Sequence, residues 1–116
     1  MANGSVLDLS TETDGDTTVV IPSGRIDGST ASPFQEALLK LIEEGKGSLV
    51  VDFENIEYIS SAGLRVLLLA AKQLQAGGRK IVLCAMRDHI AEVFKISGFS
   101  EILAIHPTRQ DAINAG

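Results

Sequence analysis

The stretch from residue 48 to 64 carries the strongest fold signal in the chain and reads SLVVDFENIEYISSAGL. Residues 48–53 are nearly all apolar or β-branched, which is typical of a strand that is buried on both faces of a sheet. Residues 80–85, KIVLCA, have the same character. Between the two runs, apolar residues at helical spacing predict a helix over about 61–76, which Gly77-Gly78 ends. Two buried strands joined by a helix predict parallel pairing with a right-handed crossover.

The residues before this stretch predict an antiparallel hairpin. Residues 5–13 alternate weakly between apolar and polar, as in an edge strand, and Asp14-Gly15 is a turn signal because glycine accepts positive φ. A return strand follows at 17–21. Proline cannot donate to a ladder, so this strand is expected to end or bulge at Pro22. The predicted sheet is therefore mixed.

Capping residues mark the helix that follows the hairpin. Ser32 is a good N-cap, and Pro33 suits the first helical position. Gln35 completes a capping box, and Gly45 ends the apolar stripe of the helix. We therefore expect a helix that begins after Ser32 and ends before Gly45.

The C-terminal third continues the alternation of helices and strands. A helix is expected over about 88–97 with Gly98 as its stop, a short strand over 102–105, and a final short helix capped by Thr108. Strands that alternate with helices predict an α/β fold. We expect one domain over residues 1–116, with a mixed β-sheet, an N-terminal antiparallel hairpin and helices in the β-α crossovers.

Composition excludes several classes of partner. The net charge is −5, with 10 Lys and Arg against 15 Asp and Glu, and aromatic residues are few, so we expect no nucleic-acid binding. The N-terminus has no basic start, and no apolar run is long enough to cross a bilayer, which predicts a cytoplasmic protein without a membrane segment. No metal-ligand spacing is visible, and Cys84 falls in a buried strand, so neither metal nor cofactor is expected.

Three loops are expected to leave the carboxyl ends of the parallel strands at one edge of the sheet, where open α/β proteins place their sites. They contain Asp27, residues 57–63 and residues 86–88. The middle loop sets two serines, Ser60 and Ser61, at the start of a helix. A serine there can cap the helix, and a helix start also favours a phosphate group, so both interpretations are open at this point.

Two features of the helix after the serines also have two interpretations each. Gly63 would let another backbone approach, or it would allow the helix to pack tightly on the sheet. Val66 and Leu69 lie opposite the expected core stripe, beside Arg65, and indicate either a docking surface or ordinary apolar residues under a neighbouring loop. The expected core stripe consists of Leu64, Leu67, Leu68, Ala71 and Leu74.

Residues 50–64 resemble the signature of STAS domains in bacterial anti-sigma factor antagonists, where a hydrophobic strand leads to Asp-Ser-Ser/Ala-Gly-Leu at a helix start. The resemblance makes Ser61 the phosphorylation site. The family's aspartate before that serine is Ser60 here, which leaves Ser60 as a rival acceptor. Residues 24–27, Gly-Arg-Ile-Asp, resemble the family's Gly-x-Leu-Asp. Later landmarks at 84–85, 93–94 and 96–99 extend the resemblance over essentially the whole chain.

The resemblance implies partner switching. The unphosphorylated antagonist binds an anti-sigma factor that is also a serine kinase of the GHKL type, and this binding releases a sigma factor or another client. Phosphorylation at Ser61 abolishes binding, and a serine/threonine phosphatase of the PPM type reverses it. By the same resemblance, the site loop comprises Asp27, Ser60, Ala62 and Gly63, and the partner-binding residues are Leu64, Arg65, Val66 and Leu69.

The same family offers an alternative, a STAS sensor or scaffold subunit of a larger assembly without a sigma-factor client. In either case we expect a monomer or weak dimer. Two other function classes lack their motifs. A serine hydrolase needs a base, for which only His89 and His106 are available, and there is no G-x-S-x-G elbow. A nucleotide-binding module needs a G-x-x-x-x-G-K motif, which is absent. We therefore expect a regulatory binding protein with no catalytic residue.

Overall fold

One mixed six-stranded sheet organises the computed structural model, which describes residues 7–116. Its strand order is β1-β2-β3-β5-β6, and a further strand, β4, also pairs with β2. β1 runs antiparallel to β2, and every other pairing is parallel. The strands are β1 (Leu7–Asp14), β2 (Thr17–Ile26), β3 (Leu49–Asp52), β4 (Asn55–Ile59), β5 (Ile81–Cys84) and β6 (Ala104–His106). The α/β class and the N-terminal hairpin are therefore confirmed; residues 5 and 6 of the predicted first strand lie outside the described residues.

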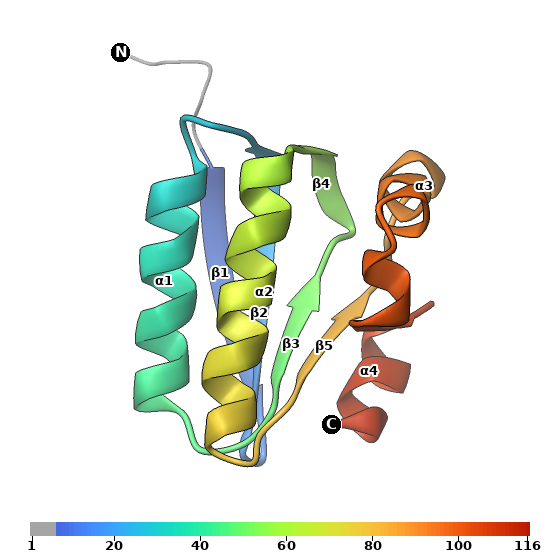
Figure 1. The fold of residues 1–116 in the computed structure, drawn as a ribbon. Coiled ribbons are helices and arrows are strands. Elements are labelled where there is room, and N and C mark those ends of the chain that lie inside the picture. The colour runs from blue at the N-terminus through green and yellow to red at the C-terminus, as the bar shows by residue number, and fades with distance from the viewer. Residues whose placement is uncertain (1–6) are drawn as a thin grey trace.

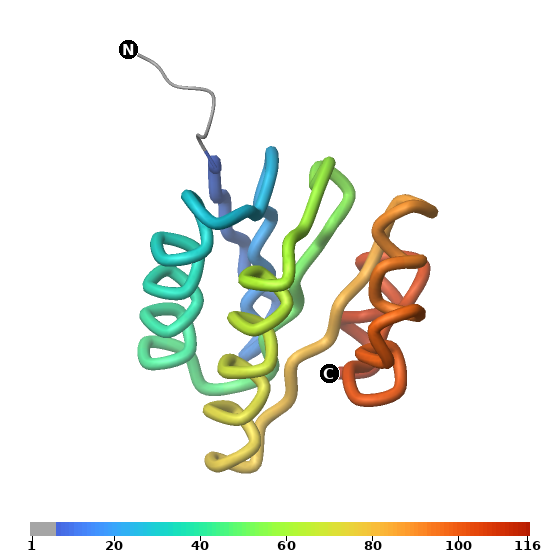
Figure 2. Tube along the Cα trace, turned by 45° about the horizontal axis from the view of Figure 1, so that its top comes forward, coloured from blue at the N-terminus to red at the C-terminus, as the bar shows by residue number. Residues whose placement is uncertain are grey.

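Helices cover both faces of this sheet. They are α1 (Ala31–Glu44), α2 (Ser61–Ala76), α3 (Asp88–Ile96) and α4 (Arg109–Ala115), with a 3₁₀ turn at Phe99–Glu101. α1 and α2 lie side by side on one face (Figures 1 and 2). The main core joins side chains of α1, α2 and α3 to alternate strand residues such as Val51 and Leu83. The intervening residues, such as Val50 and Val82, face α4 in a smaller cluster. Burial on both faces explains the continuous apolar runs of β3 and β5.

β2 extends beyond the point where the sequence predicted its end. It continues through Pro22 to Ile26 without a break in its register to β1, so the expected end or bulge at Pro22 is wrong. β2 pairs with β3 as far as Val20 and with β4 from Ser23 onward. Pro22 lies between the segments that pair with β3 and with β4. The sheet needs no N–H donor at that position, so the proline breaks no hydrogen bond of the ladder. The second partner, β4, consists of residues that the sequence analysis placed partly in the loop before the serines.

α1 begins earlier than predicted. Its N-cap is Thr30 and its first residue is Ala31, so the prediction of Ser32 as N-cap and of the capping box with Gln35 is wrong. The Thr30 hydroxyl accepts from the backbone N–H of Asp27 at 2.9 Å and donates to the carbonyl of Arg25 at 2.8 Å, which fixes a turn directly after β2. Pro33 is tolerated in the first turn because N–H groups there have no partner within the helix.

The later elements follow the predictions closely. α2 has the predicted bounds, and α3 ends at Ile96, two residues before Gly98, whose φ is +84°. The Thr108 hydroxyl accepts from the backbone N–H of Asp111 at 3.1 Å and so caps α4 as expected. β6 begins two residues later and ends one residue later than predicted, because the 3₁₀ turn precedes it. No helix within residues 7–116 has the length and apolarity needed to span a bilayer.

Candidate functional site at the serine loop

The ends of β2 and β4 place the two expected site loops side by side. Ile26 pairs with Ile59, and the backbone N–H of Ser60 donates to the carbonyl of Ile26 at 2.8 Å. Asp27 follows the first strand, and Ser61 follows the second. Both therefore lie at the edge of the sheet where α1 and α2 begin (Figure 1), as the sequence predicted.

Ser60 and Ser61 have different structural roles. Ser60 is the N-cap of α2, and its hydroxyl oxygen accepts from the backbone N–H of Gly63 at 3.3 Å. Ser61 is the first residue of the helix and is exposed, and its hydroxyl makes no hydrogen bond to another described residue. Because Ser60 does the capping, the hydroxyl of Ser61 is not needed as a cap and lies exposed at the positive end of the helix dipole.

Gly63 allows α2 to pack closely on the sheet. A Cβ atom at this position would lie 2.6 Å from Cγ2 of Ile26 and 2.8 Å from Cγ1 of Ile59, both shorter than any ordinary carbon contact. These two side chains end β2 and β4. Of the two interpretations of Gly63, the structure supports tight helix packing, because the space above the glycine is already filled.

Asp27 fixes the turn before α1. Its carboxylate accepts from the backbone N–H of Ser29 at 2.9 Å, from the Ser29 hydroxyl at 2.7 Å, and from the backbone N–H of Thr30 at 3.2 Å. These hydrogen bonds, above all that from the Ser29 hydroxyl, hold the pKa of the Asp27 carboxyl below its ordinary value. The other carboxylate oxygen lies 3.7 Å from Nε of Arg25. Asp27 therefore caps this turn, close to the serine loop.

The outer face of α2 is narrower than the sequence predicted. Leu69 is 42% exposed and Arg65 is exposed, as expected. Val66, however, is only 4% exposed, so its placement on the outer face is wrong. Gln73, two helical turns after Val66, lines a hollow together with residues of α1. Val66 is therefore on the flank of α2 that α1 covers. Leu64, expected both in the core stripe and at the partner surface, is buried.

Two residues at this edge were missed by sequence reasoning. The Arg25 guanidinium lies 4.5 Å from the ring centroid of Tyr58, and Tyr58 is 41% exposed. The two residues are register partners in β2 and β4. Arg25 and Tyr58 thus form a cation–π pair beside the serine loop. Prediction of β4 as a strand next to β2 could have revealed them, because it would have placed the two residues opposite each other.

A buried ion pair stabilises the turn that connects β3 to β4. Oδ2 of Asp52, a side chain that is 1% exposed, accepts from Nε of Arg109 at 2.7 Å. Oδ1 of Asp52 accepts from the backbone N–H of Glu54 at 2.9 Å, and the same guanidinium reaches Oε1 of Glu12 at 3.0 Å. Burial, with the nearby Asp52 charge, raises the pKa of the Cys84 thiol to about 12. Sequence analysis did not identify this pair. It fixes the turn from which β4 leads to the serines.

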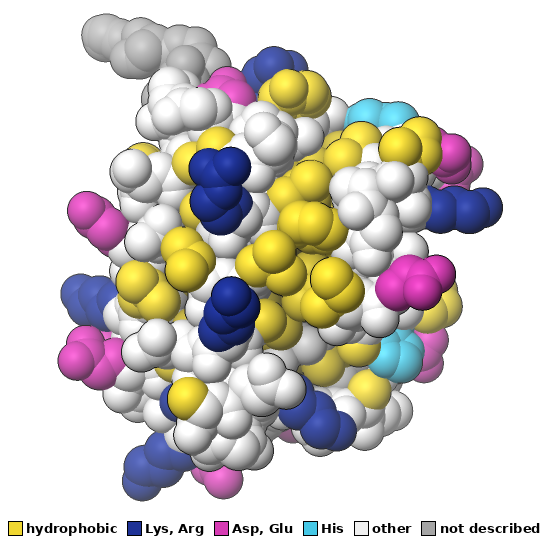
Figure 3. Space-filling view, in the orientation of Figure 1, with side chains coloured by type: hydrophobic (Ala, Val, Ile, Leu, Met, Phe, Trp, Pro, Cys, Tyr) yellow, Lys and Arg dark blue, Asp and Glu magenta, His cyan; other side chains and the backbone are white. Residues whose placement is uncertain are grey.

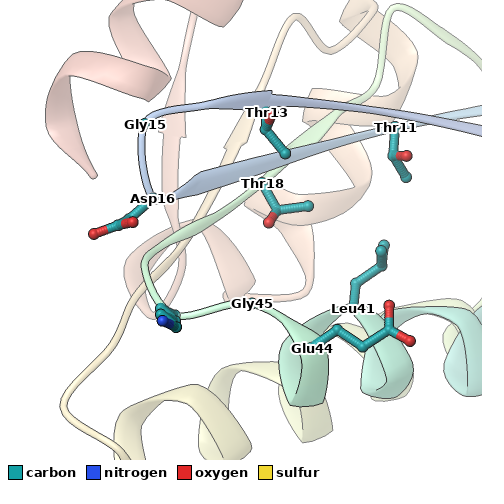
Figure 4. Close-up of a pocket in the computed structure, with 9 residues that line it drawn as sticks. Thr11, Thr13, Gly15, Asp16, Thr18, Leu41, Glu44 and Gly45 are labelled. Carbon is teal, nitrogen blue, oxygen red and sulfur yellow. The ribbon is translucent and has the colours of Figure 1, made fainter.

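A polar hollow of about 460 Å³ lies at the opposite end of the sheet. Threonines of the β1–β2 hairpin, among them Thr13 and Thr18, face Leu41 and Glu44 of α1 across it (Figure 4). No residue that the sequence singled out for function lines this hollow. The candidate site is therefore the serine edge.

Comparison with known proteins agrees with this fold. A family model described as the STAS domain matches residues 8–112. BtrV of Bordetella bronchiseptica, which is assigned as an anti-sigma factor antagonist, is 39% identical over 92 residues, or 79% of each protein.

Two solved structures share the fold at low sequence identity. An anti-sigma factor antagonist from Mycobacterium paratuberculosis has a TM-score of 0.89 at 23% identity, over 99% of this chain and 97% of that one. The Bacillus cell fate determinant SpoIIAA, solved in its phosphorylated form, has a TM-score of 0.71 at 19% identity, over 93% of this chain and 98% of that one. The family model and the BtrV match show that this chain belongs to the STAS domain family, among the anti-sigma factor antagonists.

Proposed function

We propose that this chain is the antagonist in a cytoplasmic partner-switching pathway. In its unphosphorylated form it binds an anti-sigma factor that is also a serine kinase of the GHKL type, and binding releases the client of that kinase. Phosphorylation at Ser61 abolishes binding, and a PPM-type phosphatase restores it. The chain acts as a monomer or weak dimer and contributes no catalytic residue. The likeness to the anti-sigma factor antagonists supports this proposal.

The observation that carries the proposal is that the two serines have different structural roles. Ser60 caps α2, while Ser61, one residue later, presents an exposed hydroxyl that bonds to none of residues 7–116. A phosphate there adds about −1.5 to −2 charges and three acceptor oxygens. The helix start favours that charge, so the phosphorylated chain can stay folded. The change falls on the surface that a partner would touch, where it repels acidic groups and must be desolvated on binding.

The proposed partner surface combines the exposed residues around Ser61. It comprises Arg65 and Leu69 on α2. The cation–π pair of Arg25 and Tyr58 borders it at the strand ends, on the sheet face opposite Ile26 and Ile59, which pack against α2. Exposed aromatic and arginine side chains are the types that most often dominate protein interfaces. Leu64 and Val66 are buried, so they are not part of this surface.

Phosphopeptide mapping after incubation with the cognate kinase and ATP tests the acceptor. We expect modification at Ser61 in the wild type and in Ser60→Ala, and none in Ser61→Ala. Modification that persists in Ser61→Ala and vanishes in Ser60→Ala would move the acceptor to Ser60. A chain that binds the kinase but is modified at neither serine would be a scaffold rather than a switch.

A further inference from the structure

A second, apolar groove lies along the C-terminal half of α2. It has a volume of about 480 Å³, and its floor includes Leu68 and Ala71 of α2 and Leu103 before β6. Ile102, on its rim, is 66% exposed, which is unusual for a large branched side chain beside a hollow. Figure 3 shows apolar side chains gathered in a band across this face of the molecule. Such a continuous exposed apolar surface marks an interaction site more often than scattered apolar residues do.

The charge around this groove is opposite to that of the whole chain. Lys72, Arg79 and Lys80 line it, and none of the described lining residues is Asp or Glu. The chain as a whole has 15 acidic and 10 basic residues. Arg79 is held in place, because its guanidinium donates to the carbonyls of Gly47 at 2.9 Å and Ile42 at 2.8 Å. Lys72 and Lys80 are both exposed. The Lys80 ammonium donates to the carbonyl of Ala115 at 3.5 Å, which leaves its other two N–H groups, and the whole Lys72 ammonium, directed to solvent among the described residues.

The groove is separate from the serine edge. Leu68 is seven residues after Ser61 in α2, and Gln75 is a further seven residues, or about two turns, along the helix. At 1.5 Å per residue these positions are about 10 to 21 Å from Ser61 along the axis of α2. Neither Arg25 nor Tyr58 lines the groove. The groove therefore begins about 10 Å from Ser61 along the helix, and it borders the proposed partner surface only at Leu69, which lies next to Leu68.

We propose that this groove docks an acidic amphipathic helix of a partner protein. Apolar side chains at helical spacing on that helix fill the floor formed by Leu68, Ala71 and Leu103, and they cover Ile102. Carboxylates on its flanks meet Lys72 and Lys80. Helix-in-groove recognition uses such a pattern of anchors, and opposite charges at the rim select the partner and its orientation. The proposal goes beyond the serine switch and does not depend on phosphorylation.

The test uses the 116-residue chain labelled with ¹⁵N and two helix-forming peptides. Both peptides carry leucines at i, i+3, i+4 and i+7; one has glutamates and the other lysines at the remaining positions. We expect the glutamate peptide to shift the amide signals of residues 68–75 and 102–104, and the lysine peptide to bind far more weakly. Shifts that concentrate at Asp27 and Ser61, equal binding of both peptides, or no binding of the acidic peptide would overturn the proposal.

Matched variants of the chain sharpen this test. Lys72→Glu is expected to weaken binding of the acidic peptide roughly tenfold. Lys46→Glu makes the same change in net charge at an exposed loop position outside the groove and is expected to have no effect. Ile102→Ser, which alters an exposed side chain, is expected to weaken both peptides. An acidic peptide that binds Lys72→Glu and Lys46→Glu equally would show that the groove does not select charge. Since Ser61 is unchanged throughout, these results are independent of the phosphorylation proposal.

Discussion

Removal of Arg109 should destabilise the whole fold, although the residue lies in the last helix. Arg109→Ala leaves the carboxylate of Asp52 buried, with the backbone N–H of Glu54 as its remaining partner. Breaking a fully buried ion pair in this way costs about 3–5 kcal/mol. Because the Arg109 side chain is 33% exposed, water screens part of the interaction. We therefore expect a loss of about 2–3 kcal/mol, which is a melting temperature lower by roughly 10 °C.

Urea denaturation and thermal melting measure this loss. Glu12→Gln is the matched control, because Glu12 contacts the same guanidinium but its side chain is 58% exposed, and its loss should cost less than about 1 kcal/mol. The double variant Asp52→Asn/Arg109→Ala should be more stable than the sum of the two single losses predicts. A loss below about 1 kcal/mol for Arg109→Ala would refute the reasoning, since the pair would then be screened by solvent.

The remaining predictions concern the helix after the serines and the buried thiol. Leu69→Glu should abolish binding of the anti-sigma partner with little change in melting temperature, whereas Val66→Glu should unfold the chain because it buries an unpaired charge. Comparison of their thermal melts decides whether only Leu69 is at the surface. Gly63→Ala should lower the free energy of unfolding by about 1–3 kcal/mol through overpacking, offset by about 1 kcal/mol gained in helix propensity. Urea denaturation measures the net change, and a variant more stable than the wild type would contradict the close contact. The Cys84 thiol, with a pKa of about 12, should resist iodoacetamide at mildly alkaline pH until the chain is unfolded; rapid alkylation of the native protein would disprove its burial.

The parts of the fold that could be predicted are those whose environment is uniform along the chain. β3 and β5 are buried on both faces, so every residue had to be apolar or paired, and the sequence shows this directly. α2 ends at a Gly-Gly pair and begins at a serine cap, and both are local signals. The placement of Asp27 and Ser61 at one edge followed from the parallel order of the strands alone.

β4 could not be recognised because a bulge hides its periodicity. Gly24 pairs with Ile56 and Arg25 with Tyr58, so Glu57 is an extra residue in β4. The two buried residues, Ile56 and Ile59, are therefore three positions apart instead of two or four. A pattern search for alternation reads such a segment as a loop. The strand is stabilised by its partner β2, which the local sequence does not reveal.

The other errors also arose from contacts that are distant in the sequence. Val66 is buried because α1 covers one flank of α2, and a helical stripe alone cannot show where a neighbouring helix will pack. The true start of α1 is set by the turn that Asp27 and Thr30 form after β2. Asp52 and Arg109 are separated by 57 positions, so neither residue signals the other.

Calorimetric titration of Ser61→Ala and Ser61→Asp against the purified anti-sigma kinase tests the central claim most directly. Both variants should fold like the wild type, because Ser60 and not Ser61 caps α2. We expect Ser61→Ala to bind as tightly as the unphosphorylated wild type and to remain bound when ATP is added. Ser61→Asp should bind at least roughly tenfold more weakly, although Arg65, one turn along the helix, partly neutralises the new charge. Equal affinities of the two variants would contradict the account, because the exposed serine would then not control binding.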